Sequence, residues 1–182
     1  SIICSNCIYR NKRLFRIMSK IFYFGGQKSG KTKAGSKKAL DLAQNSKPYY
    51  VATYDNSYGD VSMNERINRH ISERKDDFIC IEEAKDLRKV VEANNTYLID
   101  CISMWLLNNL SCSEDELKQQ LRTICKIDAN IIFILNDVSC GVIPIDTESR
   151  KFVDFSGLLG QELASLCDEV YEVKYGIERR LK

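Results

Sequence analysis

Ile21-Phe22-Tyr23-Phe24-Gly25-Gly26-Gln27-Lys28-Ser29-Gly30-Lys31-Thr32 is the stretch of this sequence that decides the fold. Its apolar first part predicts a buried strand, and residues 25–32 match the pattern G-x-x-x-x-G-K-[ST]. Gly25 and Gly30 allow the chain to turn so tightly that successive backbone N–H groups face a phosphate. The helix predicted for residues 33–43 adds the positive end of its dipole. The stretch therefore predicts a P-loop that binds a nucleoside triphosphate.

The last two side chains of this motif are expected to contact the phosphates and the metal ion. Lys31 reaches the outer phosphates and is a catalytic candidate, while Thr32 offers a hydroxyl to Mg²⁺. Asp100 closes the apolar run 97–99, and an aspartate at a strand end is the usual second half of a P-loop site. We therefore predict that Thr32 and Asp100 are the metal ligands. Residues 52–54 close an earlier strand and are expected to line the nucleotide pocket.

The composition agrees with a modest globular enzyme. Of the 182 residues, 44% are hydrophobic and 29% are charged, and the formal net charge is +2. Such a charge predicts no strong attraction to nucleic acid, and the apolar runs are too short to span a membrane. Residues 18–182 are expected to form a single P-loop domain. Residues 1–17 are basic without any acidic residue, which indicates a separate N-terminal extension, disordered or loosely packed.

The eight cysteines are scattered along the chain. Cys80, Cys101 and Cys125 fall inside apolar strand or helix patterns, which is typical of buried free thiols in a reducing compartment. The sequence therefore favours a cytoplasmic enzyme. Cys4 and Cys7 form the only close pair, but a zinc site needs a second pair or nearby histidines, and none follows.

Beyond the P-loop, apolar strand and helix patterns alternate. The predicted strands cover residues 49–53, 78–81, 96–101, 130–135 and 169–175, and the predicted helices cover residues 61–74, 83–93, 102–110, 113–126 and 148–167. Ser113 and Glu116 predict a capping box at the start of the fourth of these helices. This order predicts an α/β fold, P-loop NTPase-like (RecA-like), with a mostly parallel sheet and helices on both faces. The ligand is expected at the carboxyl ends of the strands.

His70 is the only histidine of the chain. It lies on the helix predicted for residues 61–74, together with Arg66, Arg69 and Arg74. Positive neighbours disfavour the imidazolium ion, so this imidazole is expected to be neutral at pH 7 and able to attack a phosphorus atom. The other common nucleotide carrier, the lysine of a K-x-D-G motif, is absent. The residues alone equally allow a half-buried histidine without a chemical role.

From about residue 21 onward the chain resembles the bifunctional adenosylcobinamide kinase/adenosylcobinamide-phosphate guanylyltransferase family of cobalamin biosynthesis. The matching blocks are, in chain order, Gly25-Gly26-x-x-Ser29-Gly30-Lys31-Thr32; Tyr50-Val51-Ala52-Thr53; Met63-x-x-Arg66-Ile67-x-x-His70-x-x-x-Arg74; Phe78-x-x-x-Glu82; Leu98-Ile99-Asp100-Cys101-x-x-x-Trp105-x-x-Asn108; Asn136-Asp137-Val138-x-x-Gly141-Val142-Ile143-Pro144; and Cys167-Asp168-Glu169-Val170. Many enzymes share the P-loop, whereas R-I-x-x-H and N-[ED]-V-x-x-G-[IV]-[IV]-P in this order are far more specific.

The resemblance implies two reactions and a set of residues for them. A γ-phosphate of GTP or ATP passes to adenosylcobinamide, and GMP from GTP then passes through a covalent guanylyl-histidine at His70 to adenosylcobinamide phosphate, giving adenosylcobinamide-GDP. It further implies Mg²⁺ as cofactor and a homotrimer with sites near subunit boundaries. The residues that it implies for GTP are Gly25, Gly26, Gln27, Lys28, Ser29, Gly30, Lys31, Thr32, Ala52, Thr53, Tyr54, Ile71, Ser72, Glu73, Arg74, Glu82 and Asp100.

The chain also departs from the family pattern, mainly between residues 137 and 161. Asp137 replaces the more usual glutamate, Ser139 replaces a glycine, and Gly160 replaces an asparagine before Gln161. Because the departures lie in this stretch, the resemblance supports corrinoid binding or the kinase half less strongly than it supports GTP binding. Two other functions stay open from the residues: a P-loop kinase of another small metabolite without a covalent intermediate, and a non-catalytic regulatory P-loop protein.

Overall fold

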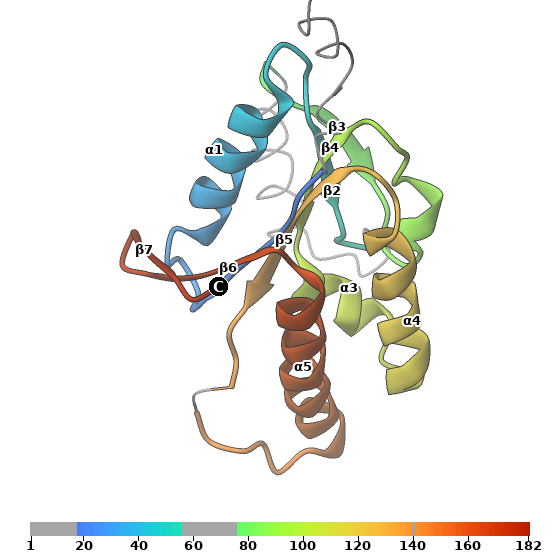
Figure 1. Cartoon of the computed structure of the whole chain (residues 1–182). Coiled ribbons are helices and arrows are strands. Elements are labelled where there is room, and N and C mark those ends of the chain that lie inside the picture. Colours follow the sequence, from blue (N-terminus) through green and yellow to red (C-terminus); the bar gives the residue numbers. More distant parts are fainter. Residues whose placement is uncertain (1–17, 56–75, 140) are drawn as a thin grey trace, which may run out of the picture.

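A seven-stranded sheet forms the centre of the part of the chain that the structure describes (Figure 1). The computed structural model describes residues 18–55, 76–139 and 141–182. Its strands are β1 (Lys20–Gly25), β2 (Tyr49–Ala52), β3 (Ile79–Glu82), β4 (Thr96–Asp100), β5 (Asn130–Asn136), β6 (Glu169–Lys174) and β7 (Ile177–Arg180). They lie in the order β3-β2-β4-β5-β1-β6-β7, and every neighbouring pair is parallel except β6–β7. The predicted, mostly parallel sheet is confirmed.

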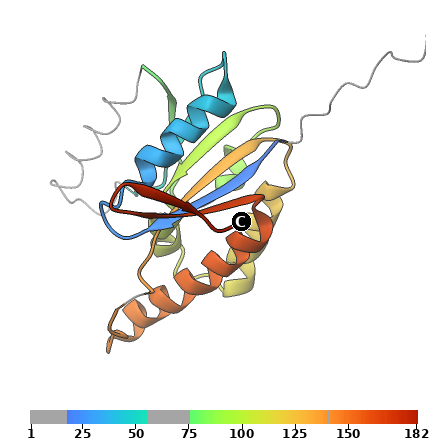
Figure 2. The ribbon, with the colours of Figure 1, turned by 60° about the vertical axis from the view of Figure 1, so that its left-hand side comes forward.

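Helices cover both faces of this sheet. They are α1 (Lys31–Ala43), the 3₁₀ turn η2 (Leu87–Lys89), α3 (Ile102–Asn108), α4 (Glu114–Cys125) and α5 (Thr147–Leu166). Figure 2 shows α1 and α5 on opposite sides of the sheet. The predicted capping box is present at the start of α4, where Ser113 and Glu116 cap each other's backbone. No helix within the described ranges combines the length and apolar character needed to span a membrane.

The alternation of side chains along the strands explains the two layers. In β1, Ile21 and Tyr23 belong to the apolar cluster beneath α1, whereas Phe22 belongs to the cluster beneath α3, α4 and α5. A strand covered on both faces needs apolar residues at every position, which is why the strand Asn130–Asn136 appears as a continuous apolar run. In the described chain Cys101, Cys112, Cys125 and Cys167 are free thiols, as predicted.

The helix predicted for residues 83–93 is wrong. Only η2 (Leu87–Lys89) forms there, because short acidic side chains bind the backbone N–H groups that a helix needs. One carboxylate oxygen of Glu83 accepts hydrogen bonds from the amides of Lys85 and Asp86, both at 2.8 Å. Asp86 in turn accepts from the amide of Arg88 at 3.2 Å. The helical spacing of apolar residues in this stretch instead reflects a loop that buries Leu87 and Val91.

The sequence patterns also miss β7. Tyr175 and Gly176, with φ of 53° and 78°, form a tight turn after β6, and β7 then pairs antiparallel with it. All four residues of β7 are exposed, so the strand has no apolar face to reveal it. The remaining strands and helices agree with the predicted ones to within a few residues, apart from the helix predicted for 61–74, which lies outside the described residues.

Candidate nucleotide site

The P-loop connects the end of β1 to the start of α1. Gly30 caps α1 in the left-handed conformation, with φ of 100°, and no side chain caps the helix. The first turn of α1 contains no acidic residue. The free N–H groups and the positive end of the helix dipole are therefore available to an anion, as the sequence pattern predicts.

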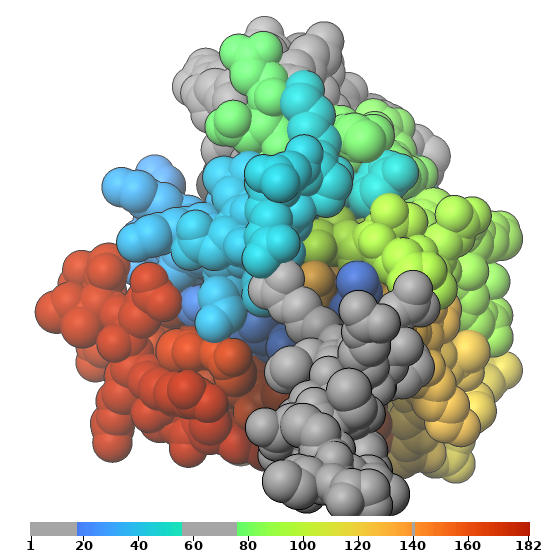
Figure 3. Space-filling model, turned by 45° about the horizontal axis from the view of Figure 1, so that its top comes forward, coloured from blue at the N-terminus to red at the C-terminus, as the bar shows by residue number. Residues whose placement is uncertain are grey.

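Neighbouring strand ends hold this loop in place. A Cβ at Gly25 would lie 2.2 Å from the carbonyl oxygen of Val173 in β6, so only glycine fits there. The amide of Asp137 donates to the Gly25 carbonyl at 2.9 Å, and the amide of Gly176 donates to the Ser29 carbonyl at 2.7 Å. The β6–β7 turn thus supports the P-loop through the hydrogen bond from Gly176 to Ser29. Figure 3 shows the β6–β7 hairpin beside α1. No sequence pattern predicts this contact, because the residues of β7 are all exposed and show no apolar face.

Lys31 is buried, with only 6% of its surface exposed. Its Nζ donates to the carbonyl oxygen of Gly26 at 3.0 Å, so the ammonium lies folded over the loop. Burial lowers the pKa of Lys31, and the negative charge of Asp100 raises it in part. A cation held without a full countercharge in this position favours the binding of an anionic group.

Asp100 lies next to the P-loop helix, as predicted. The Thr32 hydroxyl donates to Asp100 Oδ1 at 3.5 Å, and the Tyr50 hydroxyl donates to Asp100 Oδ2 at 2.7 Å. Hydroxyl and carboxylate oxygens are the hard donors that Mg²⁺ prefers, so Thr32 and Asp100 fit a magnesium site. Tyr50 is missing from the predicted site residues, although its position on the strand before residues 52–54 is the signal that points to it.

The other predicted residues occupy the same edge of the sheet where the structure describes them. Ala52 pairs in register with Glu82 on one side and with Asp100 on the other, so these three lie in one row at the carboxyl ends of β2, β3 and β4. Thr53 follows directly and is fully buried, and Gln27 and Lys28 are exposed at the tip of the P-loop. Tyr54 also lies within the described ranges. His70, Ile71, Ser72, Glu73 and Arg74 lie outside the described residues.

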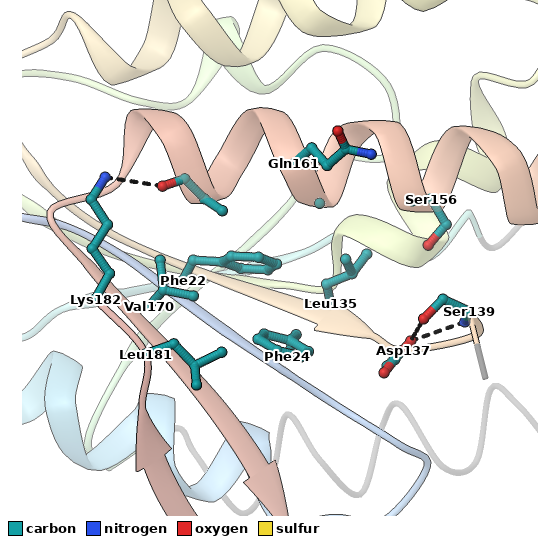
Figure 4. Close-up of a pocket in the computed structure, with 13 residues that line it drawn as sticks. Phe22, Phe24, Leu135, Asp137, Ser139, Ser156, Gln161, Val170, Leu181 and Lys182 are labelled. Atoms are coloured by element: carbon teal, nitrogen blue, oxygen red, sulfur yellow. Dashed lines mark hydrogen bonds between the residues drawn. The ribbon is translucent and has the colours of Figure 1, made fainter.

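A separate cavity of about 440 Å³ lies between α5 and the sheet (Figure 4). Phe22, Phe24 and Leu135 form its apolar wall. Asp137 and Ser139 stand at one end, where the Ser139 amide donates to Asp137 Oδ1 at 2.9 Å. Because the amide of Asp137 also contacts Gly25, this end of the cavity adjoins the start of the P-loop.

A family model and two curated relatives point to the same family. Residues 21–181 match the family described as cobinamide kinase / cobinamide phosphate guanyltransferase. The bifunctional adenosylcobalamin biosynthesis protein CobP of Pseudomonas aeruginosa is 32% identical over 169 residues, which cover 87% of this chain and 94% of that protein. The bifunctional protein CobU of Escherichia coli is 24% identical, covering 89% of this chain and 99% of that protein.

Solved structures agree on the fold. The flagellar accessory protein FlaH of Methanocaldococcus jannaschii superimposes with a TM-score of 0.50 at 18% identity, covering 90% of this chain and 78% of that one. At this identity the likeness concerns the architecture only. The parallel sheet, the P-loop after β1 and the flanking helices together are the P-loop NTPase-like, RecA-like fold.

Proposed function

The chain belongs to the cobinamide kinase / cobinamide phosphate guanyltransferase family, and on that premise we propose that it phosphorylates adenosylcobinamide and then transfers GMP to adenosylcobinamide phosphate. As a member it is a kinase and a nucleotidyltransferase. The observation that carries the proposal is the P-loop with Lys31, Thr32 and Asp100 gathered around it. Such a site serves both reactions, because each begins with a bound nucleoside triphosphate.

In the kinase step, the hydroxyl oxygen of the aminopropanol arm of adenosylcobinamide attacks the γ-phosphorus of GTP or ATP. The bond from this phosphorus to the β-phosphate oxygen breaks, GDP or ADP leaves, and the hydroxyl proton passes to solvent. The loop amides and the Lys31 ammonium stabilise the charge on the transferring group. For this, Lys31 leaves the Gly26 carbonyl and turns to the phosphates. Thr32 and Asp100 would hold Mg²⁺, which supplies further positive charge to the phosphate oxygens when bound.

In the second step, His70 carries the nucleotide. A ring nitrogen of the neutral imidazole attacks the α-phosphorus of GTP, the bond to the β-phosphate oxygen breaks, and pyrophosphate leaves. A phosphate oxygen of adenosylcobinamide phosphate then attacks the same phosphorus, and the imidazole departs to leave adenosylcobinamide-GDP. The proposal is supported by the family membership and by the fact that His70 is the only histidine.

The nucleotide contacts follow the carboxyl edge of the sheet. We assign residues 25–32 to the phosphates, and the row formed by Ala52, Glu82 and Asp100 supports a nucleotide laid across β2, β3 and β4. Thr53, Tyr54 and residues 71–74 complete the set that the family resemblance implies for GTP.

A homotrimer is part of the same proposal. Val142, Ile143 and Ile145 are 95%, 72% and 95% exposed on the loop before α5, and apolar side chains gathered in this way are typical of a protein contact. The free thiols of Cys101, Cys112, Cys125 and Cys167 support a reducing compartment such as the cytoplasm, because cysteines in an oxidising compartment are usually paired in disulfides.

The covalent intermediate provides the direct test. Incubation with Mg²⁺ and GTP labelled at the α-phosphate should leave the label on the protein, and the label should be lost in acid and survive alkali, as phosphoramidates do. GTP labelled at the γ-phosphate should leave no label from this step, because that phosphorus departs with pyrophosphate. The label is measured on the intact protein after gel filtration.

His70→Asn is the matched variant for this experiment. It should abolish the label while GTP still binds. A label that persists in His70→Asn would place the nucleotide on another type of residue and contradict the mechanism. An unlabelled wild type that binds GTP would instead favour a plain kinase without a covalent intermediate.

A further inference from the structure

Asn108, the last residue of α3, contacts two strand-end loops of the candidate site at once. Its Nδ2 donates to the carbonyl of Thr53 at 2.7 Å and to the carbonyl of Ala84 at 2.9 Å. Thr53 directly follows β2, and Ala84 follows β3 by two residues. Both amide hydrogens of one side chain therefore fix the spacing between two loops that are distant in the sequence.

Trp105 of α3 and Asn109, the residue that directly follows α3, hold the second loop beside Asn108. The Trp105 indole Nε1 donates to the carbonyl of Lys85 at 2.9 Å, and Asn109 Nδ2 donates to the same carbonyl at 3.3 Å. Trp105 is fully buried, so its ring is a rigid anchor. The consecutive carbonyls of Ala84 and Lys85 lie outside regular secondary structure, so they need other hydrogen-bond donors. Side chains at the carboxyl end of α3 provide these donors.

The first loop is tied in turn to the predicted metal ligand. The Thr53 hydroxyl donates to the Cys101 carbonyl at 2.7 Å and accepts from the Cys101 amide at 2.9 Å. Cys101 follows Asp100 and is the residue that precedes α3. Asp100, α3, Asn108, Thr53 and Cys101 are therefore linked in a closed path of covalent and hydrogen bonds.

We propose that Asn108 is a positioning residue for the nucleotide, setting the distance between the ends of β2 and β3. This inference rests on the proposed function, in which Thr53 and Glu82 at these ends hold GTP. Asn108 Oδ1 is buried and has no hydrogen-bond partner among the described residues, so the side chain acts here through its two donors. Trp105 and Asn108 also belong to the family block that begins at Leu98. The proposed contacts with phosphate do not explain why these two residues are part of it.

The test compares the binding of a whole nucleotide with the binding of its phosphate chain alone. Calorimetry measures the affinity of Asn108→Ala for GTP with Mg²⁺ and, separately, for inorganic tripolyphosphate, which contacts only the P-loop side. We expect GTP to bind at least about tenfold more weakly and tripolyphosphate to bind within about twofold of the wild type. Asn108→Ser, which keeps one donor, should show the same pattern to a smaller degree.

Asn130→Ala is the matched control, because Asn130 is a buried asparagine at the amino end of β5, the end of the strands opposite to the candidate site. Its Nδ2 donates to Thr96 Oγ1 at 3.1 Å. The variant should lose stability without losing GTP affinity. Unchanged GTP affinity in folded Asn108→Ala, or an equal loss for tripolyphosphate, would overturn the inference. So would failure of both Asn108 variants to fold while Asn130→Ala folds. Absence of the His70 label in a wild type that binds GTP would overturn the proposed transfer alone and leave this comparison of affinities valid.

Discussion

The P-loop and the paired ends of β2 and β3 form two sides of the same site, yet they are built differently. The P-loop consists of consecutive residues whose own backbone provides the binding groups, and Gly30 and Lys31 need no distant side chain to adopt their roles. The ends of β2 and β3 are held by Asn108 and Trp105, which come from a helix 20 to 55 positions away in the sequence. The binding groups of the P-loop side are therefore local in sequence, although strand ends support the loop, whereas the spacing of the other side depends on tertiary contacts of side chains.

Because of this difference, substitutions on the two sides should impair different properties of the protein. Truncating a P-loop side chain such as that of Lys31 removes a group that we assign to the phosphates and should leave the fold intact. A substitution beneath β2 and β3 shifts backbone that lines the site, and it leaves buried polar groups without partners. Activity should therefore respond most on the first side, and stability on the second.

Lys31→Ala should have the largest effect. It removes the cation that serves the phosphates in both reactions, and we expect kcat/KM to fall about 10²–10³-fold for the kinase and for the guanylyl transfer. Calorimetry with Mg²⁺ and GTP provides the binding measurement, and Lys37→Ala, which changes an exposed lysine of the same helix, is the control. Affinity for GTP equal to that of the wild type would refute the assignment of the P-loop.

Tyr50→Phe should have an intermediate effect. The variant keeps the ring and removes the hydroxyl that donates to Asp100 at 2.7 Å, so the carboxylate loses one of its two fixed contacts. A hydrogen bond to a charged group contributes about 1.5–3 kcal/mol, so we expect half-maximal activity to require about tenfold more Mg²⁺. At saturating Mg²⁺ most of kcat should return.

Tyr23→Phe is the control for that experiment. It removes another buried hydroxyl, which donates to Glu178 at 3.4 Å on the same face of the sheet. Its Mg²⁺ dependence should match that of the wild type. An equal shift in both variants would mean that loosening this face of the sheet, rather than the contact with Asp100, changes the response to Mg²⁺.

Gln120→Leu should have the smallest effect on activity and a clear one on stability. Gln120 Oε1 accepts from the Leu87 amide at 2.8 Å and from Trp105 Nε1 at 3.2 Å, beneath the loop that follows β3. The buried Leu87 amide loses its acceptor, while Trp105 Nε1 keeps only the Lys85 carbonyl, so the free energy of unfolding should fall by about 1–3 kcal/mol. Urea denaturation measures this loss, and the exposed Gln119→Leu is the control. A tenfold loss of GTP affinity here would show that the two sides of the site are not separable.

Much of the fold follows from patterns that a linear sequence contains. Apolar runs of strand length alternate with helical stretches, and most strands and helices form where they are predicted. The exceptions have physical causes. Residues 83–93 have helical spacing, but Glu83 and Asp86 bind the backbone amides, and β7 has no apolar face because it is an exposed edge strand.

The sequence by itself determined the P-loop side of the candidate site. The spacing of Gly25, Gly30, Lys31 and Thr32 specifies a loop whose geometry is local, and Asp100 is visible because an apolar strand ends on it. Only the tertiary structure decided which side chains surround these groups. The strand order sets β2 beside β4, which brings Tyr50 to Asp100, and it sets β6 beside β1, which brings Gly176 to Ser29. Contacts such as these, and that of Asn108 with Thr53, join distant parts of the chain, so no local pattern of residues contains them.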